Sequence, residues 1–121
     1  ATRLSKIHCK DVVIGISGGL DSTLALLVCH EAGILVSITT DSPVIPEQYL
    51  SLCAALASKE GMDELEAIKA ITINPAKILK LDNRIGSIKE GKDADFIICT
   101  KNILDTTNEI KSVYIDGKKA V

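Results

Sequence analysis

The segment from Gly33 to Pro43, with the sequence GILVSITTDSP, constrains the fold of this chain more than any other. Ile34 to Ile38 are almost all apolar and mostly β-branched, which favours a strand covered on both faces, as in a parallel sheet. Pro43 has no N–H to donate, so the strand is expected to end before it. Asp41 therefore follows the C-terminal end of a predicted parallel strand, where α/β folds place their catalytic and binding groups.

A second predicted strand, Asp11 to Ile16, comes earlier, followed by the turn SGGLDS and an Ala- and Leu-rich helix over Thr23 to Glu31. Asp21 or Ser22 is expected to cap this helix, and Gly33 to end it. Strand, helix and strand together predict a right-handed βαβ unit. The glycines either make only a tight connection or expose N–H groups to an anion such as phosphate at the helix N-terminus.

The stretch from Val12 to Val28 resembles the first βα unit of the NAD synthetases. In that family a Ser-Gly-Gly-x-Asp-Ser loop, the PP-loop, holds the pyrophosphate of ATP. The resemblance implies a phosphate site, with the following residues as its members: Ser17, Gly18, Gly19, Asp21 and Ser22. The residues that complete the ATP, magnesium and deamido-NAD sites of that family have no counterpart here. Weak binding of phosphate or ATP is therefore expected, without adenylation chemistry.

Helices are predicted over Glu47 to Glu60, over Asp63 to Ile71 and over Ala76 to Leu81. Pro46 and Asn74-Pro75 mark two of the starts, Asp63-Glu64-Leu65-Glu66 is similar to a capping box, and Gly61 marks an end. Three strands are expected after them, over Phe96 to Thr100, Ser112 to Ile115 and Lys118 to Val121. Asp116-Gly117 is typical of a hairpin turn between the last two strands.

From about residue 31 onward the chain resembles the C-terminal part of the metal-dependent amidohydrolases, especially their imidazolonepropionase-like branch. The segments that carry this resemblance are AGILVSITTDSPVIP (32–46), AITINPA (70–76), GSIKEGKDADFII (86–98) and VYIDG (113–117). The resemblance implies that residues 33–82 correspond to the last barrel strand and the helices after it. Residues 83–121 would correspond to strands of a small β-sandwich, which strands from the N-terminal part of that family complete.

In that family the last barrel strand carries an aspartate that binds metal or acts as general base, and Asp41 matches it. The histidine ligands of that family come from other strands, and neither His8 nor His30 matches them. A zinc site uses about four ligands, three of them from the protein. We therefore expect no cofactor, with a divalent metal only if the chain is a hydrolase. Asp41 is either a catalytic carboxylate or a helix cap or solvated strand-end residue.

The sequence therefore predicts a recombined or engineered chain, with a PP-loop segment over residues 1–32 joined to amidohydrolase-like residues 33–121. The expected fold is α/β: a small βαβ unit, two or three further helices and a C-terminal β-meander, an incomplete amidohydrolase barrel and sandwich. Three functions remain open. The first is a fragment without catalytic activity, the second a hydrolase of cyclic amide or C–N bonds that uses Asp41, and the third a phosphate-binding module.

Composition limits the partners of the chain. The formal net charge of −2 and the aromatic content of 2% do not favour nucleic acid as a partner. Four widely spaced cysteines indicate reduced thiols in a cytoplasmic protein, and no apolar run is long enough for a membrane span. The open strand edges left by the missing barrel and sandwich strands predict a homo-oligomer.

Overall fold

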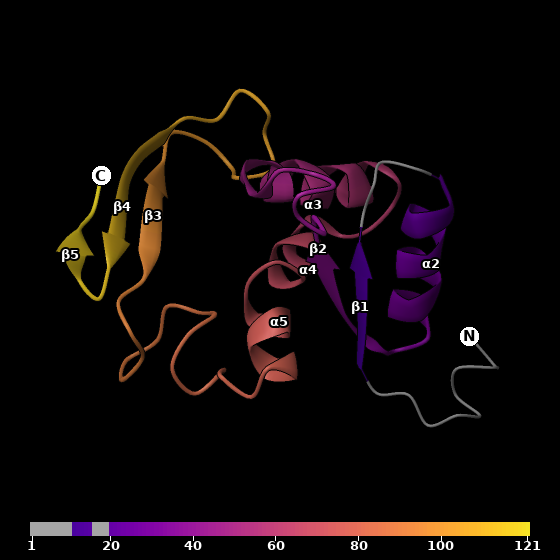
Figure 1. Cartoon of the computed structure of the whole chain (residues 1–121), viewed down its shortest axis with the longest axis horizontal. Helices are drawn as coiled ribbons and strands as arrows, with labels where there is room; N and C mark the ends of the chain where they lie inside the picture. Colours follow the sequence, from indigo (N-terminus) through magenta and orange to yellow (C-terminus); the bar gives the residue numbers. More distant parts are fainter. Residues whose placement is uncertain (1–10, 16–19) are drawn as a thin grey trace.

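The computed structural model describes residues 11–15 and 20–121, beginning with a strand–helix–strand unit. Strands β1 (Asp11–Gly15) and β2 (Leu35–Thr39) pair in parallel, with Asp11 opposite Leu35 and Gly15 opposite Thr39. Helix α2 (Leu20–Glu31) joins them and lies alongside both strands (Figure 1). The predicted βαβ unit is confirmed, although Ile16, the predicted end of the first strand, lies outside the described residues.

The start of α2 differs from the prediction, and its end agrees with it. The helix begins at Leu20, so Asp21 and Ser22 lie in its first turn and do not cap it from outside. At the other end the N–H of Gly33 donates to the His30 carbonyl at 2.9 Å, and that of Ile34 to the Cys29 carbonyl at 3.1 Å. With φ of 75° at Gly33, this is a Schellman C-cap.

Four short helical elements follow β2. They are η1 (Glu47–Tyr49), α3 (Leu50–Lys59), α4 (Glu64–Lys69) and α5 (Ile73–Ile78). The predicted helix from Glu47 to Glu60 is present but opens with a 3₁₀ turn. As the capping pattern indicated, the Asp63 carboxylate accepts the N–H groups of Leu65 and Glu66, at 3.0 and 3.2 Å.

The boundaries of α5 differ from the prediction of Ala76 to Leu81. The helix includes Asn74 and Pro75, because a proline in a first turn removes an N–H that has no intrahelical partner. It ends early because Lys80 adopts a left-handed conformation, with φ of 62°. The N–H of Leu81 then donates back to the Ala76 carbonyl at 2.8 Å. Lys80 thus occupies at the end of α5 the position that Gly33 occupies at the end of α2.

The hydrophobic core lies between the βαβ unit and the helices that follow it. Its strand residues are Val36 and Ile38, on one face of β2, and Leu26 of α2 is fully buried against them. The other buried members are Ile34, Met62 and small side chains, namely Cys29, Cys53, Ala54, Ala57, Ala67 and Ala70. Small residues allow the helices to approach the sheet closely, so a largely aliphatic core forms without large aromatic groups.

The edge of β2 opposite β1 is covered by the α4–α5 connection. The N–H of Ile38 donates to the Ala70 carbonyl at 2.9 Å. The side-chain amide of Asn74, which is buried, donates to the Val36 carbonyl at 2.9 Å. An open strand edge was expected here, because the neighbouring barrel strands are missing. The structure instead satisfies two of its polar groups through helices, as buried backbone groups require.

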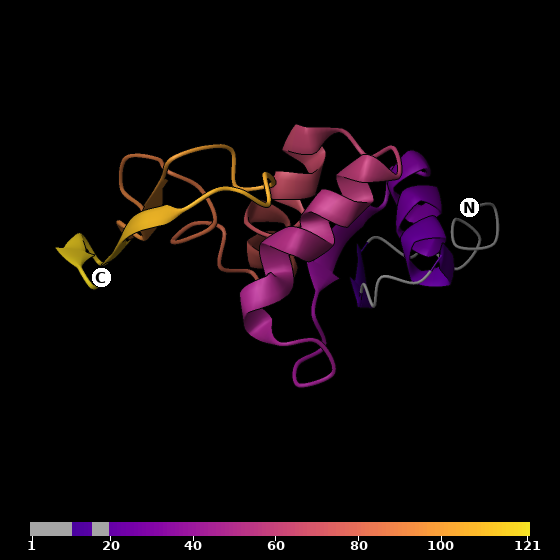
Figure 2. The ribbon, with the colours of Figure 1, turned by 90° about the horizontal axis from the view of Figure 1, so that it is seen from above.

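The C-terminal part is the predicted antiparallel meander, in the order β3 (Phe96–Cys99), β4 (Ile110–Ile115) and β5 (Lys118–Lys119). Phe96 lies opposite Tyr114 and their rings stack with centroids 4.7 Å apart. The β4–β5 turn has positive φ at Asp116 and Gly117, 51° and 73°, as a tight hairpin requires. Figure 2 shows the meander projecting away from the helices. The predicted α/β fold is confirmed.

Two connecting segments link the meander to the rest of the chain. Residues 100–109 return to the helices, where Leu104 packs against the core and the Asn102 side chain donates to the Glu64 carboxylate at 3.4 Å. The segment after α5 is held by Gly86, whose backbone lies so close to α5 that an added Cβ would be 2.8 Å from the Ala76 Cβ. The Arg84 guanidinium also bonds the Asp93 carboxylate, at 2.9 Å.

Candidate functional site

Asp41 lies in the turn directly after β2, as predicted, and its side chain is exposed. Its N–H donates to the Thr39 hydroxyl at 3.3 Å, and its carbonyl accepts the N–H of Val44 at 2.9 Å. The residue is left-handed, with φ of 53°, a conformation that aspartate tolerates better than most residues. The turn therefore leads the chain out of the sheet and leaves the carboxylate facing solvent. Asp41 caps no helix through a side-chain bond that the structure records.

A cavity of about 610 Å³ lies beside this turn. Ser37 and Thr39 contribute to it from β2, at positions that alternate with the core residues Val36 and Ile38. Its other polar lining residues are Thr40, Ser42 and Glu47, and its apolar ones are Ile38, Leu50, Ile71, Pro75, Ile78 and Leu79. Thr40 and Ser42, the neighbours of Asp41, line the cavity, whereas Asp41 does not.

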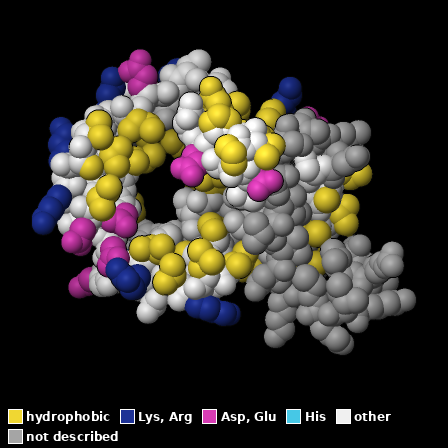
Figure 3. All heavy atoms as spheres, viewed as in Figure 1, with side chains coloured by type: hydrophobic (Ala, Val, Ile, Leu, Met, Phe, Trp, Pro, Cys, Tyr) yellow, Lys and Arg dark blue, Asp and Glu magenta, His cyan; other side chains and the backbone are white. Residues whose placement is uncertain are grey.

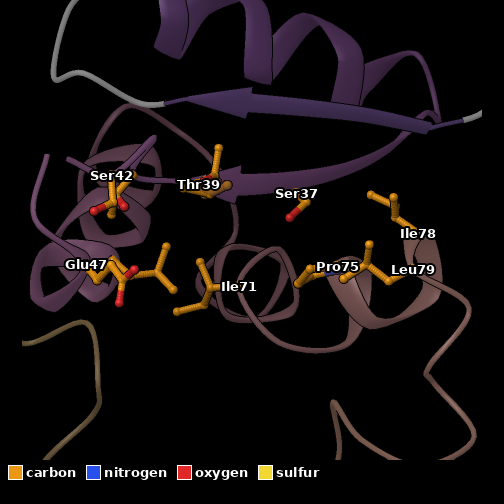
Figure 4. Close-up of a pocket in the computed structure, with 11 residues that line it drawn as sticks. Ser37, Thr39, Ser42, Glu47, Ile71, Pro75, Ile78 and Leu79 are labelled. Atoms are coloured by element: carbon orange, nitrogen blue, oxygen red, sulfur yellow. The ribbon is translucent and has the colours of Figure 1, made fainter. Parts of the chain in front are cut away.

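The cavity has two chemically different ends (Figure 4). Ser42 and Glu47 lie together at the end toward which β2 runs, and Ile78 and Leu79 lie at the opposite end, with Thr39 and Ile71 between them. Among the described residues that line the cavity, none is Lys, Arg or His, and Glu47 is the charged one. The local field at the polar end is therefore negative.

This cavity was not predicted from the sequence. Ser37, Thr39, Ser42 and Glu47 were not among the candidate site residues. One signal was present: Ser37 and Thr39 are polar at alternate positions of an otherwise apolar strand, which indicates a distinct second face. The residues from α5 gave no such signal, because their place under β2 depends on the long-range Asn74 contact.

A smaller hollow of about 270 Å³ lies where residues 103–110 meet η1 and α3. The Thr107 side chain and N–H donate to the Asp105 carboxylate, at 2.6 and 2.7 Å. These hydrogen bonds hold the pKa of Asp105 below its ordinary value. In the core, burial raises the pKa of the Cys53 thiol, which makes it a poor nucleophile.

The predicted phosphate-binding residues fall at the edge of the described part of the chain. Ser17, Gly18 and Gly19 lie outside the described residues. Asp21 and Ser22 lie in the first turn of α2, which directly follows the predicted loop. His30 is in the last turn of the same helix. Within residues 11–15 and 20–121, no three His, Cys, Asp or Glu side chains are grouped as metal ligands would be.

The sequence of the chain matches a protein family described as the amidohydrolase family over residues 20–120. The match includes α2, which the sequence analysis placed in the first segment; the boundary at residue 32 stays a prediction. In the part of the chain that the structure describes, no helix combines the length and apolar character needed to cross a membrane.

Individual relatives agree with this family match. An adenine deaminase from Clostridium botulinum is 32% identical over 109 residues, which cover 89% of this chain and 16% of that protein. An imidazolonepropionase from Thermoplasma acidophilum is 38% identical over 77 residues, 62% of this chain and 19% of that protein. The crystal structure of an amidohydrolase from Thermotoga maritima superimposes with a TM-score of 0.80 at 37% identity, covering 83% of this chain and 26% of that one. The chain thus spans about a fifth or less of these two curated relatives.

Proposed function

The chain belongs to the amidohydrolase family, and on that premise we propose that it is a C-terminal amidohydrolase segment without hydrolytic activity of its own. It supplies the carboxylate at the end of the last barrel strand, Asp41. The observation that supports this is the setting of Asp41: a solvent-facing side chain on an exposed turn, directly after a parallel strand. Such a carboxylate acts in catalysis only when other groups hold a reacting atom beside it.

The described residues do not fit a resident metal. A catalytic zinc or similar ion uses about three protein ligands, each a deprotonated or neutral donor aimed at one point. Asp41 provides one, and the described part of the chain gathers no group of three around it or elsewhere. In an active amidohydrolase, the remaining ligands would have to come from a longer polypeptide.

An assay of ammonia release from adenine tests this proposal, since adenine is what the Clostridium relative is named for. We expect no release above the buffer rate, with or without added Zn²⁺. Turnover that disappears in Asp41→Asn and persists in Asp82→Asn would overturn the proposal. Asp82 is a suitable control because it lies in the loop after α5, outside the residues that line the cavity.

The second candidate function is hydrolysis of a cyclic amide or another C–N bond, with Asp41 as the catalytic carboxylate. Family membership and the strand-end position of Asp41 favour it. This function requires a divalent metal, and therefore ligands beyond the one that the described residues offer. The adenine assay, extended to a cyclic imide, separates the two candidates.

We also propose that Ser17, Gly18, Gly19, Asp21 and Ser22 bind phosphate or pyrophosphate weakly, as part of an NAD-synthetase-like segment. The supporting observation is that α2 starts at Leu20, so the N-terminus of a helix follows the glycines directly. Without a basic clamp, affinity should be on the order of millimolar. Titration with pyrophosphate should shift the amide resonances of Gly18, Gly19 and Asp21. Shifts elsewhere but not at these amides would show that this loop is not the site.

A further inference from the structure

We propose that the 610 Å³ cavity beside β2 binds small amphiphilic cations, specifically a primary ammonium group on an aliphatic body. Its size falls within the range of roughly 300–1,000 Å³ that is usual for small-molecule sites. It is lined from β2, the following turn, η1, α3, α5 and the residues just before α5. Such a site goes beyond the proposed function, because it needs neither a metal nor the Asp41 side chain.

The polar end provides what an ammonium group requires. An ammonium has three N–H donors and no acceptor. The Glu47 carboxylate and the Ser42 hydroxyl lie together there (Figure 4), with the Thr39 hydroxyl further along the cavity. All three accept hydrogen bonds, and the bond to Glu47 would be charge-assisted, which makes it about twice as strong as a neutral one.

The opposite end provides a surface for an aliphatic chain. Pro75, Ile78 and Leu79 line it, with Ile71 between the two ends (Figure 4), and Leu79 is 66% exposed before any ligand binds. Covering such side chains stabilises a complex by roughly 25 cal/mol per Å² of apolar surface removed from water. A ligand that spans both ends therefore gains from both halves of the cavity.

The charge of the lining selects against anions. A carboxylate or phosphate at the polar end would meet Glu47, and none of the described lining residues is basic. Like charges at short range repel more strongly beside an apolar wall than in water. The site is therefore distinct from the proposed phosphate loop in both position and ligand charge.

Titration of the full 121-residue chain with hexylammonium, hexanoate and hexanol, followed by amide NMR, tests this inference. Hexylammonium should shift the amides of Thr39, Ser42, Glu47 and Ile78, with an affinity on the order of millimolar. Hexanoate should leave them unchanged, and hexanol should bind more weakly than the ammonium. Equal binding of all three would show that the cavity is only an apolar surface, and absence of hexylammonium shifts there would overturn the proposal.

Two pairs of variants test the two ends separately. Glu47→Gln should weaken hexylammonium binding by about three- to tenfold, whereas Glu90→Gln, an exposed glutamate elsewhere, should not. Leu79→Ser should weaken hexylammonium binding by about threefold. Leu65 is 58% exposed on α4, and Leu65→Ser should leave the binding unchanged. Equal effects within either pair would contradict the assigned ligand contacts. Asp41→Asn should leave hexylammonium bound, so this result is independent of hydrolytic activity.

Discussion

Lys80 adopts a left-handed backbone conformation, which at the C-terminal end of a helix is usually adopted by glycine. Its φ is 62°, and it ends α5 with the same pattern of hydrogen bonds that Gly33 provides for α2. The left-handed conformation costs an L-residue about 1–2 kcal/mol. Glycine removes this cost but loses about 0.4–1 kcal/mol through the greater freedom of the unfolded chain.

We therefore predict that Lys80→Gly raises the free energy of unfolding by about 0.5–1 kcal/mol. Urea unfolding followed by circular dichroism would measure the change. Lys80→Ala serves as the control, because it removes the charge and keeps the Cβ. A gain of the same size in Lys80→Ala would show that charge, and not backbone conformation, is responsible.

Gly86 is required both by its backbone conformation and by the close packing around it. Its φ is 93°, and an added Cβ would lie 2.8 Å from the Ala76 Cβ, 3.0 Å from the Ile73 Cα and 3.1 Å from the Thr72 carbonyl oxygen. Gly91 has a similar φ of 88° but nothing within 4 Å of an added Cβ. A comparison of the two positions therefore separates the energetic cost of backbone conformation from that of overpacking.

Gly86→Ala should lower the free energy of unfolding by about 2–4 kcal/mol, because overpacking adds to the conformational cost. Gly91→Ala should lower it by about 1–2 kcal/mol, from conformation alone. Chemical unfolding of both variants gives the difference. Equal losses would mean that the segment after α5 moves away from the helix freely, so that the close approach has no energetic weight.

At the scale of the elements, β2 depends on contacts from distant residues. Its polar groups opposite β1 bond to Ala70 and to the side chain of Asn74. Asn74→Ala removes the donor and leaves the buried Val36 carbonyl unpaired, at a cost of about 1–3 kcal/mol. Asn83→Ala, at an exposed position, should change stability by less than about 0.5 kcal/mol. If thermal unfolding shows the same small change for both, water replaces the Asn74 amide.

The elements that the sequence predicted are those set by local signals. Gly33 ends α2, Asp63 caps α4 and Asp116-Gly117 turns β4 into β5, each through bonds within six residues. The predicted end of α5 was wrong because it depends on Lys80, whose left-handed conformation has no signature in composition. The covered edge of β2 and the cavity could not be predicted, because both depend on Asn74, which bonds Val36 from 38 residues away.

The candidate site was predictable only in part, for a related reason. Asp41 could be placed at a strand end because the apolar run before it is local. Its exposure follows from the left-handed turn, and the grouping of Ser42 with Glu47 depends on the position of η1 beside that turn. Neither is encoded in the spacing of the residues alone. The amidohydrolase resemblance came from several separated segments together, and the family match confirms it.

At the scale of the whole molecule, the meander presents exposed hydrophobic side chains. Hydrophobic groups gather over it in Figure 3, and the large exposed ones on its strands are Ile97, Ile98, Ile110 and Ile115. Within the described residues, β3 pairs on one edge only, with β4. An unpaired edge next to apolar side chains favours strand addition.

We therefore propose that the chain forms a homodimer, or a larger even-numbered oligomer, through this sheet. Sedimentation at micromolar concentration should give at least twice the 12.9 kDa of one chain. Ile98→Lys on β3 should shift the distribution toward monomer. Ile88 is 88% exposed and lies outside the sheet, so Ile88→Lys should leave the distribution unchanged. A wild-type monomer would contradict the proposal.

The metal content of the purified chain tests most directly whether Asp41 belongs to a complete hydrolytic centre. After incubation with zinc, iron or nickel and removal of the unbound ions, we expect less than stoichiometric metal, because one exposed carboxylate does not hold a divalent ion tightly. Asp41→Ala and the control Asp82→Ala should then give the same result as the unchanged chain. One metal ion per chain, lost in Asp41→Ala and retained in Asp82→Ala, would contradict the incomplete metal centre and favour the metal-dependent hydrolase.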